Sequence, residues 1–345
     1  MRMKGKFVVC LLFVVIGQGT GTDPPKEDLE IDVESGEKAV IRWQTKLIGN
    51  YTGYKLLVIP ISDPLEEIRN LALQEMQSTL NDLIPGATYE VQLHRVNRNK
   101  SSTLSVSTNF TTKPNTPGQY IVWFRNETAL LVLWEPPVPS GYFTDYKVII
   151  DPKDADVSET YVNKGDESLY AAQAAFTGLV PGSAYNISVM TISDDQISDP
   201  VTAQYRTVPL RPYNVTFNQA SITTDSFTVE WDGPDPSQVS EYDRYQVGTI
   251  GIRRKSPQII EKGAPRVAKF STDILPGRTY QVVVKTVSGS VASRPAERNV
   301  TTRPNPVINM TVIEDTETME LVLSWQPSLG SVQDSYKVCM YPFIV

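Results

Sequence analysis

The stretch LIPGATY at residues 83–89 recurs twice in this chain, as LVPGSAY at 179–185 and as ILPGRTY at 274–280. Each copy follows the pattern apolar–x–Pro–Gly–x–x–Tyr, and the copies are separated by roughly the length of one small domain. A ligand-binding motif rarely needs three copies at such intervals, whereas a structural corner is used once in every domain. The repeat therefore predicts a chain built from similar units.

Tryptophan residues mark the same units. Four of them lie 91, 97 and 94 residues apart, at Trp43, Trp134, Trp231 and Trp325. Each ends an alternating run such as FTVEW at 227–231, and alternation with a period of two is typical of a half-buried strand. Further strands begin at Tyr54, Tyr146, Tyr245 and Tyr336, and again at the tyrosine of each Pro-Gly motif. Short strands separated by turns predict one all-β sandwich per unit.

The tyrosine after each Pro-Gly pair is predicted to be a tyrosine corner, with its ring in the core and its hydroxyl bonded to the backbone just upstream. These residues are Tyr89, Tyr185 and Tyr280. Together with the four tryptophans they form the predicted structural core. In the third unit Phe270 lies one residue farther from its tyrosine than Leu80 and Phe176 lie from theirs. That offset predicts a bulge or a register shift at Phe270.

This combination of tryptophan, tyrosine and Pro-Gly corner resembles fibronectin type III modules, and the resemblance covers residues 24–345. It implies an all-β chain of tandem immunoglobulin-like β-sandwiches. The expected modules are module 1 at 24–113, module 2 at 114–209, module 3 at 210–303 and an incomplete module 4 at 304–345. The tandem also resembles the ectodomain of insect receptor-type protein tyrosine phosphatases with many fibronectin repeats. That resemblance implies a catalytic domain beyond residue 345.

The N-terminus predicts export. Basic residues precede a ten-residue apolar run at 7–16, which is too short to span a bilayer, and residues 1–19 therefore read as a signal peptide. No later stretch is long and apolar enough to cross a membrane. The chain has two cysteines, Cys10 and Cys339, and cleavage would leave only Cys339. An extracellular location also fits eight predicted N-glycosylation sites, at Asn50, Asn99, Asn109, Asn126, Asn186, Asn214, Asn299 and Asn309.

Few residues point to chemistry. The only histidine is His94, and it has no cysteine neighbours. A Ser-His-Asp triad needs a histidine beside a serine, and a typical zinc site needs several histidine or cysteine ligands, so neither is expected. The His-Cys-x5-Arg run of a tyrosine phosphatase is absent from residues 1–345. The acidic run at 151–159 lacks the spacing of an EF-hand and reads as a solvated loop. We therefore predict no catalytic residues, no cofactor and no metal site in this chain.

Charge limits the class of partner. The net charge of -7 disfavours nucleic acid. A basic cluster of Arg253, Arg254 and Lys255 is a candidate site for sulfated glycans, although an ordinary solvated surface explains it too. The resemblance implies a receptor ectodomain whose ligand is an extracellular or cell-surface protein. The alternatives are a secreted or matrix adhesion protein, or a soluble decoy, with no phosphatase domain.

Overall fold

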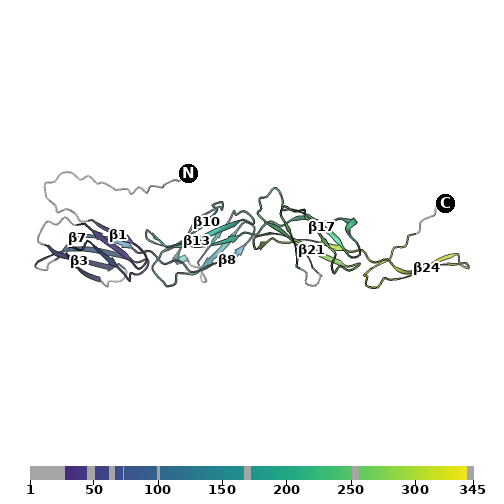
Figure 1. The fold of residues 1–345 in the computed structure, drawn as a ribbon, viewed down its shortest axis with the longest axis horizontal. Coiled ribbons are helices and arrows are strands. Elements are labelled where there is room, and N and C mark those ends of the chain that lie inside the picture. The colour runs from purple at the N-terminus through teal and green to yellow at the C-terminus, as the bar shows by residue number, and fades with distance from the viewer. Residues whose placement is uncertain are drawn as a thin grey trace. The chain divides into compact units, whose positions relative to one another are not determined.

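The computed structural model describes residues 28–44, 51–61, 67–72, 74–98, 102–166, 172–250 and 256–339 (Figure 1). Their regular structure is β-strand apart from two 3-10 turns, Lys164–Asp166 and Gln219–Ser221. The predicted all-β class is therefore confirmed. The chain divides into two compact units, Met1–Lys113 and Pro114–Val345. The predicted signal peptide at 1–19 lies outside the described residues.

Module 1 is a two-sheet sandwich. One sheet has the order β1-β2-β5, formed by Leu29–Val33, Ala39–Trp43 and Gln77–Leu80. The other has the order β4-β3-β6-β7, formed by Glu67–Ala72, Tyr51–Pro60, Thr88–Asn97 and Ser102–Thr111. All of these strand pairs are antiparallel. Alternating apolar residues from both sheets meet in one core, as the period-two pattern predicts.

Module 2 repeats this arrangement. Its smaller sheet has the order β12-β9-β8, formed by Ala172–Phe176, Leu130–Trp134 and Tyr120–Arg125. The larger sheet contains β10 (Asp145–Asp151), β11 (Glu159–Asn163), β13 (Ala184–Ser193), β14 (Gln196–Ile197) and β15 (Val201–Arg206). β13 lies at its centre, since it pairs with β10, β14 and β15.

Module 3 has the same two sheets. The smaller one has the order β16-β17-β20, formed by Tyr213–Phe217, Phe227–Asp232 and Val267–Phe270. The larger one contains β18 (Arg244–Ile250), β19 (Gln258–Glu261), β21 (Thr279–Ser288), β22 (Val291–Ala292) and β23 (Ala296–Thr301).

The expected irregularity at Phe270 is absent. Phe270 pairs with Phe227 in continuous register, as Phe176 pairs with Leu130 in module 2. The prediction of a bulge or register shift there was therefore wrong. The extra residue is accommodated in the connection after β20, because a loop absorbs one residue without turning a strand's side chains to the wrong face. The register shift of module 3 lies instead in β16, between Tyr213 and Thr216.

Module 4 differs from the prediction. β24 (Ile308–Asp315) and β25 (Glu320–Gln326) form a hairpin, but no strand begins at Tyr336 in the described residues up to 339. In the other modules the equivalent strand pairs with the strand of the corner tyrosine, and the described part of module 4 has no such strand. Trp325 packs edge-on against Tyr336 with ring centroids 5.3 Å apart, yet it is only half-buried. It does not lie in a closed core.

The three complete modules have closely similar cores. Trp43, Trp134 and Trp231 are 2%, 1% and 3% exposed. Each packs edge-on against a buried tyrosine of the larger sheet, Tyr54, Tyr146 or Tyr245, with ring centroids 5.8, 5.3 and 5.5 Å apart. Edge-to-face aromatic pairs add a stabilising term beyond their buried area. The recurring aromatic residues are therefore structural and form no exposed ligand cage.

Candidate functional surfaces

The Pro-Gly motif builds the same corner in each complete module. The hydroxyls of Tyr89, Tyr185 and Tyr280 accept a hydrogen bond from the backbone N–H five residues earlier. The distances are 2.8, 2.8 and 2.7 Å, and the donors are Ile84, Val180 and Leu275. A buried backbone N–H without a partner is costly, so the tyrosine stabilises the bend that proline and glycine create.

A buried threonine completes each corner. The tyrosine hydroxyl already bonds the N–H of Ile84, Val180 or Leu275. The threonine hydroxyl donates to the carbonyl oxygen of that same residue, at 2.7 Å in all three modules. These residues are Thr112, Thr207 and Thr302. They were not predicted from the sequence. Their signal was the pattern Thr-x-Pro at 112–114, 207–209 and 302–304, which comes after each corner tyrosine at an almost constant distance.

The acidic run of module 2 has a structural role. The Tyr185 hydroxyl donates to Asp154 Oδ2 at 3.1 Å, and Asp156 Oδ2 accepts from Thr177 Oγ1 at 2.8 Å. Burial raises the pKa of Tyr185 to about 12, and the adjacent Asp154 carboxylate adds to the shift while the Val180 N–H opposes it. Within the described residues no group of three or more His, Cys, Asp or Glu side chains is arranged to hold a metal ion.

The corner of module 2 also contacts the following module within the unit Pro114–Val345. Glu241 N–H donates to the Pro181 carbonyl at 2.8 Å, and Ser288 Oγ donates to the Gly182 carbonyl at 2.7 Å. Arg206 in turn donates to Ser288 Oγ at 2.9 Å. The glycine of the motif therefore lies directly against module 3.

Only glycine fits at this contact. Gly182 has φ +76°, and a Cβ there would lie 1.9 Å from the Glu241 carbonyl oxygen. Gly277 of module 3 is similar, with φ +70° and a Cβ position 1.7 Å from the Val332 carbonyl oxygen. Left-handed backbone and close packing each exclude a side chain. In modules 2 and 3 the Pro-Gly pair thus serves two purposes, a corner inside one module and a contact to the segment that follows.

The described sequons fall into three groups. Asn109, Asn186 and Asn299 are exposed on β7, β13 and β23, and Asn126 lies in the turn between β8 and β9. Asn214 and Asn309 have positive φ and donate Nδ2 to Asp232 Oδ2 at 2.8 Å and to Gln326 Oε1 at 3.0 Å. A glycan on either Nδ2 would replace one of its two hydrogens, so only the other could keep that bond. The two remaining sequons, Asn50 and Asn99, lie outside the described residues.

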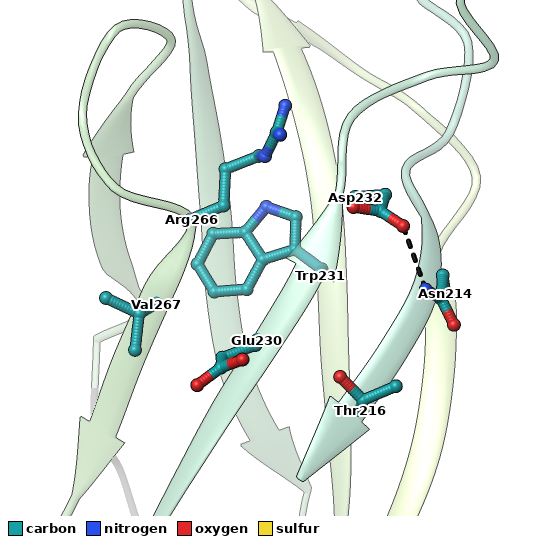
Figure 2. Close-up of a pocket in the computed structure, with 7 residues that line it drawn as sticks. All are labelled: Asn214, Thr216, Glu230, Trp231, Asp232, Arg266 and Val267. Atoms are coloured by element: carbon teal, nitrogen blue, oxygen red, sulfur yellow. Dashed lines mark hydrogen bonds between the residues drawn. The ribbon is translucent and has the colours of Figure 1, made fainter. Parts of the chain in front are cut away.

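A shallow hollow of about 390 Å³ surrounds Asn214 (Figure 2). Figure 2 shows the carboxylate of Asp232 turned toward Asn214, with Arg266 and Glu230 on different sides of the Trp231 indole. Thr216 and Val267 complete the lining. These groups do not form a nucleophile with an adjacent base, which acyl or phosphoryl transfer would require. The hollow is a polar groove on the outer face of the sheet.

The remaining predicted residues have no assigned chemistry. Arg253, Arg254 and Lys255 lie outside the described residues, and Cys339 is an exposed free thiol. His94 is half-buried with Nε2 3.2 Å from Gln92 Oε1, and its pKa is lowered by burial and by Lys55. No helix among the described residues is long and apolar enough to span a membrane.

Comparison with known proteins gives one consistent family. The profile described as the fibronectin type III domain matches residues 23–111, 115–204 and 210–303. Chicken tenascin-R is 24% identical over 91% of this chain, and rabbit collagen alpha-1(XII) chain is 25% identical over 94%. The chain spans 22% of the former and 50% of the latter. A solved two-module segment of chicken tenascin matches 54% of this chain and all of its own length, with 20% identity and a TM-score of 0.37.

Proposed function

This chain belongs to the fibronectin type III family, and on that premise we propose that it is part of an extracellular adhesion protein that acts by binding other proteins. One observation carries the proposal. In each complete module a tyrosine and a threonine hydroxyl hold the corner through the backbone, while other side chains on the outer sheet faces are exposed to solvent. Binding residues are commonly presented in this way, on surfaces positioned by a rigid scaffold.

Among the possible adhesion proteins, we favour a secreted or matrix protein. The support is the similarity to tenascin-R and to a collagen chain over more than nine-tenths of this chain. Fold alone does not define function, so the similarity supports the class of protein and not a particular ligand. The proposed partner is an extracellular or cell-surface protein.

Cell attachment tests the proposal. The full chain, secreted from a eukaryotic host with its glycans, is coated on wells, and attachment of cells is compared with wells coated with albumin. We expect attachment that a soluble excess of the chain inhibits. Equal attachment to both coatings would contradict an adhesive role. Competition with heparin separates the protein partner from the sulfated-glycan alternative, because heparin competes for basic surfaces. Replacing Arg253, Arg254 and Lys255 by alanine shows whether that cluster causes any inhibition.

A receptor-type tyrosine phosphatase is the second candidate, supported by the resemblance of the tandem to such ectodomains. The two candidates differ in the sequence expected beyond residue 345. Sequencing the transcript onward distinguishes them: a membrane span and then a His-Cys-x5-Arg run would support the receptor. Further modules without that run support the matrix protein. A stop codon directly after Val345 would instead support the soluble decoy.

A further inference from the structure

The outer face of the smaller sheet of module 2 is apolar. We define the apolar face of module 2 as Ile121, Trp123, Phe124, Leu131 and Leu133. Ile121, Trp123 and Phe124 on β8 are 56%, 70% and 52% exposed. The two leucines on β9 lie opposite them, since Ile121 pairs with Leu133 and Phe124 with Leu131. A contiguous exposed apolar group of this kind usually has an occupant.

A bulge explains how two aromatic side chains reach this face. The register of β8 shifts between Val122 and Phe124, so Trp123 is an additional residue opposite β9. Val122 remains on the core side, where it packs against the buried cluster. A bulge turns neighbouring side chains out of strict alternation, and here both Trp123 and Phe124 are exposed to solvent.

A sequon lies at the end of the same strand. Asn126 is the first residue after β8 and comes two residues after the exposed Phe124. Its N–H donates to the Ala129 carbonyl at 3.0 Å, and its side-chain Oδ1 accepts from Thr128 N–H at 2.8 Å. Among the described residues its Nδ2, the atom to which a glycan is joined, has no hydrogen-bond partner, unlike Nδ2 of Asn214 and Asn309.

The turn that carries Asn126 is also held in place. The Asn126 carbonyl accepts from Val208 N–H at 2.9 Å, and the Thr128 carbonyl accepts from Leu179 N–H at 3.1 Å. A glycan on Asn126 would therefore start from a hydrogen-bonded turn only two residues along the chain from Phe124. Because it is tethered, its contact with the aromatic rings is intramolecular and has a high effective concentration.

We propose that the first sugars of an N-glycan on Asn126 pack on Phe124 and Trp123 and cover this part of the apolar face. Sugar rings present C–H groups on their faces, and these pack well against the π-face of an aromatic ring. A protein partner approaching the same strand would meet the glycan first. The inference rests on the extracellular location in the proposed function, because only a chain that enters the secretory pathway receives such glycans.

Hydrogen exchange of the secreted full chain tests the inference. Thr128→Ala removes the sequon but keeps Asn126 and the backbone N–H that binds its side chain. We expect amides in peptides covering 119–134 to exchange about three- to ten-fold faster in Thr128→Ala. This factor corresponds to the free energy of one aromatic contact. In a Trp123→Ala/Phe124→Ala background, where both rings are removed, Thr128→Ala should cause no further change. Additive effects of removing the sequon and removing the rings would overturn the proposal.

Two controls separate the possible failures. Ser188→Ala removes the sequon of Asn186 on the larger sheet and should leave exchange in 119–134 unchanged. Glycopeptide mass spectrometry of the wild-type chain reports occupancy at every sequon. Glycans elsewhere but none on Asn126 would overturn this inference alone and leave the apolar face to another occupant. No glycan at any sequon would contradict the extracellular location as well.

Discussion

Modules 2 and 3 have nearly the same interior but opposite outer faces. Their core pairs, Trp134 with Tyr146 and Trp231 with Tyr245, have ring centroids 5.3 and 5.5 Å apart at interplanar angles of 70° and 66°. On the outer face of the smaller sheet, however, module 2 exposes tryptophan and phenylalanine. The strand registers place Thr216, Thr228 and Glu230 of module 3 where module 2 has Ile121, Leu131 and Leu133. Packing therefore constrains the core, whereas the outer face is free to differ and can carry a separate role.

The largest expected effect tests whether the two cores are equivalent. Trp134→Ala and Trp231→Ala should each destabilise their own module by about 3–5 kcal/mol, because each leaves a cavity in a closed core. Denaturant-dependent hydrogen exchange on the full chain would report each module separately. Trp325→Ala provides the contrast, since that side chain is only half-buried and should cost clearly less. Unequal losses of unfolding free energy in modules 2 and 3 would show that the two cores are not equivalent.

The corner hydroxyls should give the next largest effect. Tyr185→Phe and Tyr280→Phe each leave a backbone N–H without its partner, at a cost of about 1–3 kcal/mol. The loss in module 2 should be the larger one, because Tyr185 also donates to Asp154. Asp154→Asn in the Tyr185→Phe background should then have little effect. The free energy of unfolding of each module measures both results, and a larger loss in module 3 would contradict the extra bond.

A smaller effect concerns the contact between modules 2 and 3. Gly182→Ala should destabilise the chain by about 1–2 kcal/mol through the left-handed backbone, and should also displace the loop at Glu241. Faster hydrogen exchange at Glu241 would show the displacement. Gly263→Ala is the matched control, since a Cβ there meets nothing within 4 Å. If both substitutions left exchange at Glu241 unchanged, the contact would not need glycine.

The last effect is absent at neutral pH and is confined to alkaline solution. Burial raises the pKa of both Tyr120 and Tyr185 in module 2 to about 12, from 10.0 in an unperturbed tyrosine. A raised folded-state pKa means that the unfolded chain loses its protons first as the pH rises. The contribution to stability is therefore complete below pH 10 and is lost between about pH 10 and pH 12. Ultraviolet absorbance of tyrosinate during alkaline titration measures this, and Tyr185→Phe should remove one late-titrating group. Ionisation of every tyrosine near pH 10 would contradict it.

The sequence by itself determined the fold class and the main core residues. Successive side chains on a strand point to opposite faces, so alternation alone identifies which residues of β9 and β17 lie inside. The Pro-Gly-x-x-Tyr motif is local as well, because the tyrosine binds a backbone group only five residues away. Both signals depend on neighbours in the chain, and a repeat makes them easy to recognise.

Only the tertiary structure decided features that join distant residues. The threonine of each corner acts on a carbonyl 27 or 28 residues earlier, and Ser288 binds Gly182 across 106 residues. The strand predicted at Tyr336 failed for a related reason, since a strand needs a neighbour to pair with and the described part of module 4 supplies none. Whether a sequon's Nδ2 is already bonded, as at Asn214, also depends on the strand opposite. Local pattern specifies the face of a strand, but hydrogen-bond partners from other strands and modules are set only when the chain folds.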